Sequence, residues 1–63
     1  MSLKRNEFLQ HLSRHQCFLQ RHGSKHDIYR NFVNNKQTTV PRHPKLDKFL
    51  CDAICKQLEI PKP

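Results

Sequence analysis

The stretch His22–Arg30, which reads HGSKHDIYR, decides the fold because it carries a turn directly into a strand. Gly23 is the single glycine of the chain, and glycine is the residue expected where the backbone needs a positive φ. Two residues that favour strands, Ile28 and Tyr29, follow shortly afterwards. We therefore predict a hairpin turn at this glycine and the serine after it, with His26 presented where the turn becomes a strand.

Two further β-prone runs accompany the central strand, which spans His26–Asn31. Cys17–Leu19 precedes the turn, and Gln37–Val40 lies beyond a second turn at Asn34-Asn35. Pro41 ends the last run because its ring nitrogen cannot donate to a sheet ladder. The sequence thus predicts three short antiparallel strands.

The alternation of the central strand leaves open which of its faces is covered. It places His26, Ile28 and Arg30 on one face and the residues between them, including Tyr29, on the other. Both faces mix apolar and polar side chains, so alternation alone does not choose between them. If Tyr29 is buried, His26 belongs to the open face of the sheet; if Ile28 is buried, His26 reaches solvent only from the ragged start of the strand.

A helix is expected before the strands, from Leu3 to about His15. Within it Phe8, Leu9 and Leu12 recur at helical spacing. Ser2 is the expected N-cap, because a serine oxygen can accept a hydrogen bond from an unpaired backbone amide of the first turn. This helix presents one apolar side.

A second helix follows Pro44 and stops before Pro61, which forbids its continuation. Its expected apolar stripe consists of Leu46, Phe49, Leu50, Ala53, Ile54 and Leu58. Two helices with apolar stripes and a sheet with one face to cover satisfy each other when both helices pack on the same side. The sequence therefore predicts one α+β domain over residues 1–63, in the order α-β-β-β-α, with the opposite sheet face open.

The charge balance points to a polyanionic or acidic partner. The chain has 12 Lys and Arg against 5 Asp and Glu, a formal net charge of +7, and five histidines besides. Nucleic acid, an acidic protein and anionic lipid all fit this balance, but no run approaches the roughly 18 apolar residues of a spanning helix. The start of the chain, Met1–Asn6, lacks the apolar stretch of a secretory signal, so we expect a cytoplasmic protein without membrane contact. Seven basic residues are interpreted as solubilising surface groups: Lys4, Arg5, Arg14, Lys36, Lys45, Lys48 and Lys56.

The three cysteines, Cys17, Cys51 and Cys55, indicate a reducing compartment, since their number is odd and no CxxC pair occurs. Cys51 and Cys55 are one helical turn apart, as are His11 and His15, so a mixed metal site can be imagined. The two pairs lie on separate elements with nothing to fix them together. We expect buried structural thiols and no metal.

Several segments resemble a known family. They are the GSKH turn, Gly23–His26, with Ile28 and Tyr29 after it, then Thr39–His43, and then Ala53–Leu58. In this order and spacing they look like the HicA toxin family, also called YcfA-like, over nearly the whole chain. Two positions depart from the pattern: Phe49-Leu50 stands where many members have glycine and a polar residue, and Lys25 replaces a histidine or small polar residue.

The resemblance implies a partial double-stranded-RNA-binding fold, cleavage of messenger RNA without metal or other cofactor, and a catalytic role for His26. It also implies neutralisation by an acidic antitoxin of the HicB type, with which a higher-order toxin-antitoxin complex can form. Proteins of the double-stranded-RNA-binding fold read RNA mainly by shape and phosphate contacts.

Phosphodiester cleavage gives His26 a chemical task independently of the resemblance. A group must take a proton from the attacking hydroxyl or water, another must assist the departing oxygen, and cations must hold the phosphate. The residues expected to bind RNA are Arg21, His22, Gly23, Ser24, Lys25, Arg30, Arg42 and His43. Tyr29 is expected to pack rather than to stack on a base.

Two alternatives to the nuclease remain at this level. The first is an RNA-binding module of the same fold without chemistry, because no second acid or base is certain. The second, a DNA-binding regulator, is disfavoured because no helix-turn-helix pair is apparent.

Overall fold

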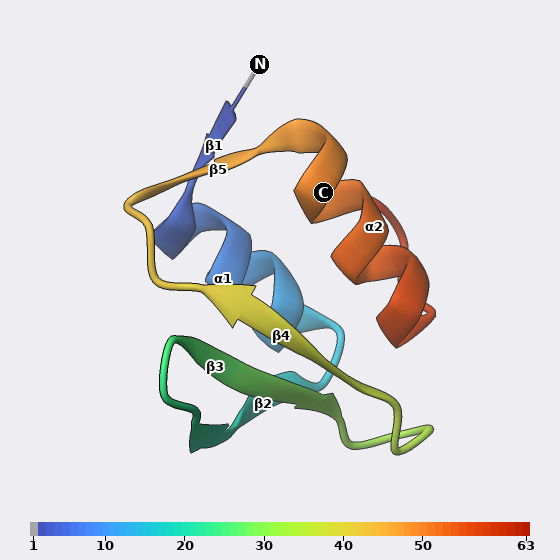
Figure 1. Ribbon diagram of the computed structural model, residues 1–63. Coiled ribbons are helices and arrows are strands. Elements are labelled where there is room, and N and C mark those ends of the chain that lie inside the picture. Colours follow the sequence, from blue (N-terminus) through green and yellow to red (C-terminus); the bar gives the residue numbers. More distant parts are fainter. Residues whose placement is uncertain (1) are drawn as a thin grey trace.

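The computed structural model describes residues 2–63. Two helices and five strands follow one another along the chain (Figure 1). In order they are β1 (Ser2–Lys4), α1 (Arg5–Arg14), β2 (Cys17–His22), β3 (His26–Asn31), β4 (Gln37–Pro41), β5 (Lys45–Asp47) and α2 (Lys48–Leu58). Neither helix is long and apolar enough to cross a membrane, within the residues described.

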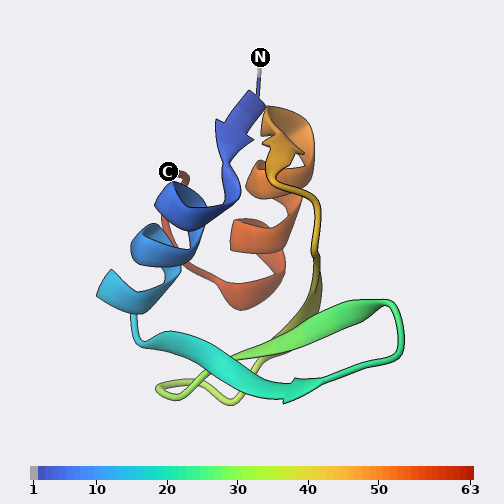
Figure 2. The same cartoon turned by 90° about the vertical axis from the view of Figure 1, so that its left-hand side faces the viewer.

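The central feature is a three-stranded antiparallel sheet in the order β2-β3-β4. Figures 1 and 2 show both helices on the same side of this sheet, with its other side open. The predicted α+β fold, with the helices on one face, is therefore confirmed. β2 contains an irregularity between Leu19 and Arg21 that shifts its register with β3.

The core lies between the sheet and the helices. It joins Phe8 and Leu12 of α1 to Val40 of β4 and to the inner side of α2. The three cysteines are free thiols buried in this core. Burial raises the pKa of Cys55 to about 11, and the other two thiol pKa values are raised by the same cause, so they remain protonated and behave as small apolar residues, as expected.

The apolar stripe expected for α2 is partly wrong. The residues of α2 that face the core are Cys51, Ile54, Cys55 and Leu58, at the spacing of one helical face. Phe49 is 79% exposed, Leu50 is 37% exposed, and Ala53 is exposed as well. The helix carries two overlapping apolar arcs, and packing on β4 selects the one that contains the thiols.

A second, two-stranded pairing joins the start of the chain to the segment just before α2, and it was not predicted. β1 pairs antiparallel with β5, so Ser2 lies opposite Asp47 and does not cap a helix. α1 begins at Arg5 after Lys4, without a side-chain cap, and the Arg5 amide donates to the carbonyl of Pro44 instead. Strands of three residues are too short to show a period in the sequence.

Candidate functional site

The GSKH turn closes the hairpin between β2 and β3. The amide of Gly23 donates to the carbonyl of His26 over 2.8 Å. Contrary to expectation Gly23 does not have a positive φ; the residues that do are Gln16, Asn35 and Glu59. The reason for glycine is space, because a Cβ at position 23 would lie 2.6 Å from the carbonyl oxygen of His26.

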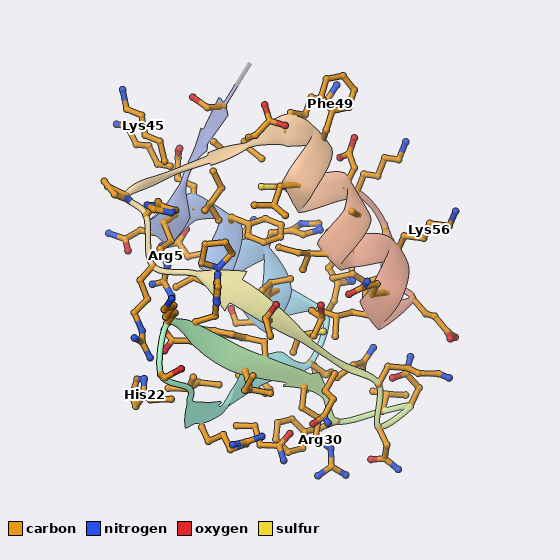
Figure 3. All side chains as sticks on the ribbon, viewed as in Figure 1. Arg5, His22, Arg30, Lys45, Phe49 and Lys56 are labelled. Carbon is orange, nitrogen blue, oxygen red and sulfur yellow. The ribbon has the colours of Figure 1, made fainter. Side chains whose placement is uncertain are left out.

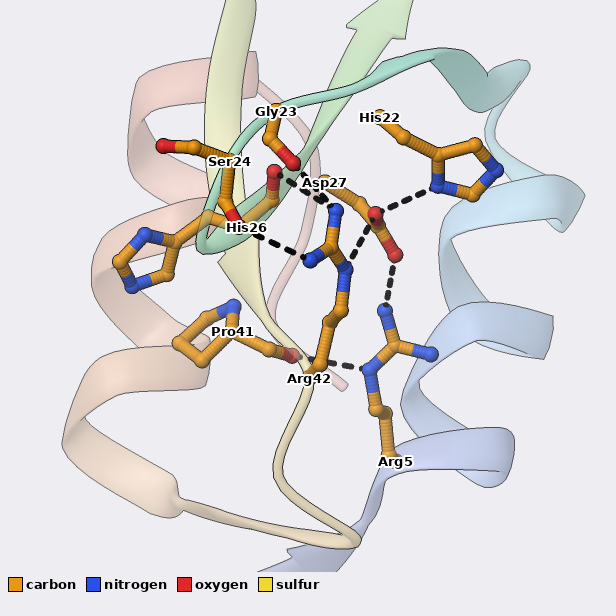
Figure 4. A network of polar contacts seen from close by, with 8 residues as sticks. All are labelled: Arg5, His22, Gly23, Ser24, His26, Asp27, Pro41 and Arg42. Atoms are coloured by element: carbon orange, nitrogen blue, oxygen red, sulfur yellow. Dashed lines mark hydrogen bonds and ion pairs between the residues drawn. The ribbon is translucent and has the colours of Figure 1, made fainter.

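Directly after the turn, the Asp27 carboxylate joins three basic side chains from three parts of the chain (Figure 4). Oδ2 accepts from Nη2 of Arg5 at 2.8 Å, and Oδ1 accepts from Nε of Arg42 at 2.8 Å and contacts Nδ1 of His22 at 2.8 Å. The Asp27 side chain is only 8% exposed. We call Asp27, Arg5, Arg42 and His22 the carboxylate cluster.

The cluster favours the ionised form of Asp27. Hydrogen bonding from His22 lowers its pKa most, bonds and charge from Arg42 and a bond from Arg5 add to this, and desolvation opposes them; the resulting pKa is about 2 instead of 3.8. The carboxylate is therefore fully charged at neutral pH and is matched by two arginines.

The interpretation of Arg5 as a solubilising surface group is wrong. Its side chain is 18% exposed, and its Nε donates to the carbonyl of Pro41 at 2.8 Å. Asp27 is the sole acidic residue between Glu7 and Asp47. A single acidic residue in a strongly basic stretch is the feature of the sequence that could have predicted ion pairs at Asp27.

Arg42, which was expected to bind RNA, holds the turn. Besides Asp27 it reaches the carbonyls of Gly23 at 2.6 Å and of Ser24 and His26 at 3.5 Å each. Its side chain is 40% exposed. Most of its donors are thus committed to keeping the GSKH turn in place.

His26 itself is exposed and points away from the cluster (Figure 4). Its carbonyl is held by Gly23 and Arg42, whereas its imidazole faces solvent. Tyr29 is buried and burial raises the pKa of its phenol, which confirms that it packs. The alternation left open by the sequence is thereby settled: Asp27 and Tyr29 face the helices, and His26 lies on the open face with Ile28.

The other residues expected to bind RNA divide between the two sides of the hairpin. Arg21 is exposed opposite Ile28, and Ser24, Lys25 and His43 are exposed in the turn and the segment after β4. His22 lies across Arg42 from His26 and contacts Asp27 (Figure 4). The two histidines that flank the turn therefore do not converge on one point.

Arg30 projects from the open side of the sheet (Figure 3). Its guanidinium lies 5.1 Å from the centroid of the Phe32 ring and donates to Oδ1 of Asn35 at 2.5 Å. Phe18 and Phe32 were not predicted to be functional residues, because the only signal in the sequence is an apolar residue among polar neighbours.

Residues 2–63 contain no cluster of three His, Cys, Asp or Glu side chains arranged to hold a metal ion. The rings of His11 and His15 are 4.8 Å apart, and Nε2 of His11 contacts the carbonyl of Pro61. The thiols of Cys51 and Cys55 are buried in the core. The two imagined halves of a metal site remain separate.

Comparison with protein families matches residues 5–60 to the family described as the HicA toxin of bacterial toxin-antitoxin systems. Neither the curated proteins nor the solved structures include a significant match. The matched region contains the whole carboxylate cluster, the GSKH turn, the three-stranded sheet and α2. The chain belongs to the HicA toxin family and so to the toxins that are paired with an antitoxin.

Proposed function

We propose that this toxin is a metal-independent endoribonuclease of messenger RNA, with His26 as its general acid or base. The observation that carries the proposal is the placement of His26: its backbone is held by Gly23 and Arg42, while its ring is free on the open face. A fixed backbone with an accessible imidazole is what proton transfer to a bound substrate requires. A messenger substrate would place its action in the cytoplasm.

Electrostatics support a polyanionic substrate at this face. Asp27 is the one carboxylate on β2, β3 and β4, and it is turned toward the helices. Arg21 and Arg30 on the open side, and Lys25 in the adjoining turn, therefore act without an opposing acid from the sheet. Such a face attracts phosphates and stabilises the charge that develops on a phosphate during cleavage.

We further propose that the partner of this face in the inactive complex is an acidic antitoxin of the HicB type. A negatively charged protein on the open face would block access to His26 and neutralise the cations around it. Copurification of the toxin with the protein encoded beside it tests the pairing. The complex should dissociate more readily as salt rises, because the attraction is between charges.

Incubation of purified protein with labelled RNA in the presence of a chelator tests the reaction. The parent protein should cleave the RNA, and His26→Ala and His26→Gln should lower the cleavage rate by at least about 100-fold, the usual contribution of a general acid or base. His11→Gln is the matched control, because His11 lies on α1 away from the turn. Both His26 variants should keep the circular dichroism spectrum and melting temperature of the parent, because the ring is exposed.

The same assay separates the nuclease from a non-catalytic RNA-binding module. A module would shift the RNA in a gel and leave it whole. Cleavage retained by His26→Ala would remove the assigned role of His26, and cleavage lost on chelation would remove the metal independence.

A further inference from the structure

Two phenylalanines and one arginine form an exposed cluster on the open face. Phe18 of β2 lies opposite Arg30 of β3 in the sheet register, and Phe32 follows the end of β3. The Phe18 and Phe32 rings are 6.0 Å apart, and the Arg30 guanidinium lies 5.1 Å from the Phe32 centroid. We call these three residues the aromatic platform.

The platform does not contribute to the core. Phe18 is 43% exposed and Phe32 is 50% exposed, so both rings keep free surface in a chain that has few large apolar residues to spare. Arg30 is held in position by its bond to Asn35, and its Nε is buried without a partner. A guanidinium held over one aromatic ring, with a second ring next to it, is an arrangement that receives planar, electron-rich groups.

Position links the platform to His26. Arg30 and His26 are four residues apart on the same face of β3, which corresponds to about 13 Å along an extended strand. No carboxylate of the sheet lies on this face. A polyanionic chain that passes His26 can therefore continue over the platform without being repelled by a carboxylate of the sheet.

We propose that the platform binds unpaired bases of the RNA by stacking, so that the toxin selects single-stranded segments. The inference rests on the proposed RNA-directed function. Bases inside a duplex present no free face to Phe18 or Phe32, whereas splayed bases stack on aromatic rings and on arginine. The open face would thus recognise exposed bases, whereas double-stranded-RNA-binding proteins recognise mainly the shape and the phosphates of a duplex.

The test measures binding in the His26→Ala background, which leaves the RNA intact. The probes are a labelled single-stranded oligoribonucleotide, the same strand annealed to its complement, and the same strand with abasic sugars. Phe32→Ala and Phe18→Ala should each weaken binding of the single strand about tenfold, the usual loss for one stacked base, and should change duplex and abasic binding less than twofold. Phe49→Ala is the matched control, because Phe49 is an exposed phenylalanine on α2, far from the sheet (Figure 3).

Phe32→Trp gives a second readout. The chain has no tryptophan, so fluorescence of the new indole should be quenched by the single strand and not by the abasic strand. Unchanged affinity for the single strand in both alanine variants would contradict the stacking role of the platform and would leave the proposed nuclease function untouched. If the parent binds neither form of RNA, the proposed function fails and the platform with it.

The antitoxin is the competing occupant of this surface. If Phe18→Ala and Phe32→Ala weaken binding of the copurified antitoxin and leave single-strand affinity unchanged, the platform is a protein interface and the proposal is wrong.

Discussion

The two faces of β3 have opposite tasks although their residues alternate along six positions. On the covered face Asp27 is bonded to three basic side chains, Tyr29 is buried, and Asn31 donates to the carbonyl of Leu58 at the end of α2. On the open face the imidazole of His26 is exposed and Arg30 is partly exposed. The contacts of the covered face hold β3 in place. The side chains of the open face are therefore not needed for folding and can bind other molecules.

The sharpest contrast is between His26 and Asp27, which are adjacent. The Asp27 carboxylate connects α1, β2 and the segment after β4, so it determines where the GSKH turn lies. His26 takes its position from that arrangement and contributes no side-chain contact to it. A variant at either position should therefore show which of the two tasks it disturbs.

The largest difference between the faces should be the difference in lost stability between Tyr29→Ala and Ile28→Ala. Truncation of a buried aromatic leaves a cavity and costs about 3–5 kcal/mol, close to the whole stability of a small domain. Ile28 is half-buried on the open face, so its truncation should cost about 1 kcal/mol. Urea unfolding followed by circular dichroism measures both losses, and equal losses would contradict the assignment of the faces.

The next effect is a pH dependence of stability that comes from Asp27. Its pKa falls from 3.8 to about 2 on folding, so the folded state favours the ionised carboxylate. That contribution is complete above about pH 5 and is lost as the pH falls toward 2. Thermal unfolding of the parent and of Asp27→Asn should differ most above pH 5.

The difference between those two proteins should shrink steadily below pH 4. The variant keeps the size of the side chain and lacks its titratable charge, so titration of the other acidic groups contributes equally to both proteins and cancels in the difference. A constant difference from pH 6 to pH 2 would show that the carboxylate is not the source.

The smallest expected effect is that of Gly23→Ala, with Ser24→Ala as the neighbouring control. The new methyl group would lie 2.6 Å from the His26 carbonyl, and since that atom belongs to the backbone the turn has to move. We expect a loss of about 1 kcal/mol for the glycine variant and a change within about 0.5 kcal/mol for the exposed serine. RNA cleavage should fall for Gly23→Ala because His26 is displaced; cleavage at the parent rate would show that the close approach does not position it.

Much of the fold could be predicted because it depends on local patterns. The apolar spacing of Phe8 and Leu12 predicts α1, and the glycine and asparagine turns separate the strands of the sheet. The errors occur where local signals are short or ambiguous. The β1–β5 pairing involves three residues on each side, and on α2 the thiols of Cys51 and Cys55 proved more central than Phe49.

The candidate site could be predicted only where it, too, depends on a local pattern of the sequence. His26 is marked by its turn, whereas Arg5 stands 22 positions before Asp27 in the chain. No spacing rule connects residues so distant, and Arg42 is equally compatible with a phosphate ligand and with a brace for the turn until its partners are known.

The sequence by itself determined the order of the main helices and strands, the hairpin at Gly23, the excess of positive charge and the family. These follow from backbone preferences, side-chain periodicity and composition, which act over a few residues or over the chain as a whole. Tertiary structure alone decided which face of β3 is covered, why Gly23 must be glycine, and that Arg5 and Arg42 meet at Asp27. Those outcomes depend on which distant side chains share one small volume, because burial and ion pairing are set by neighbours in space.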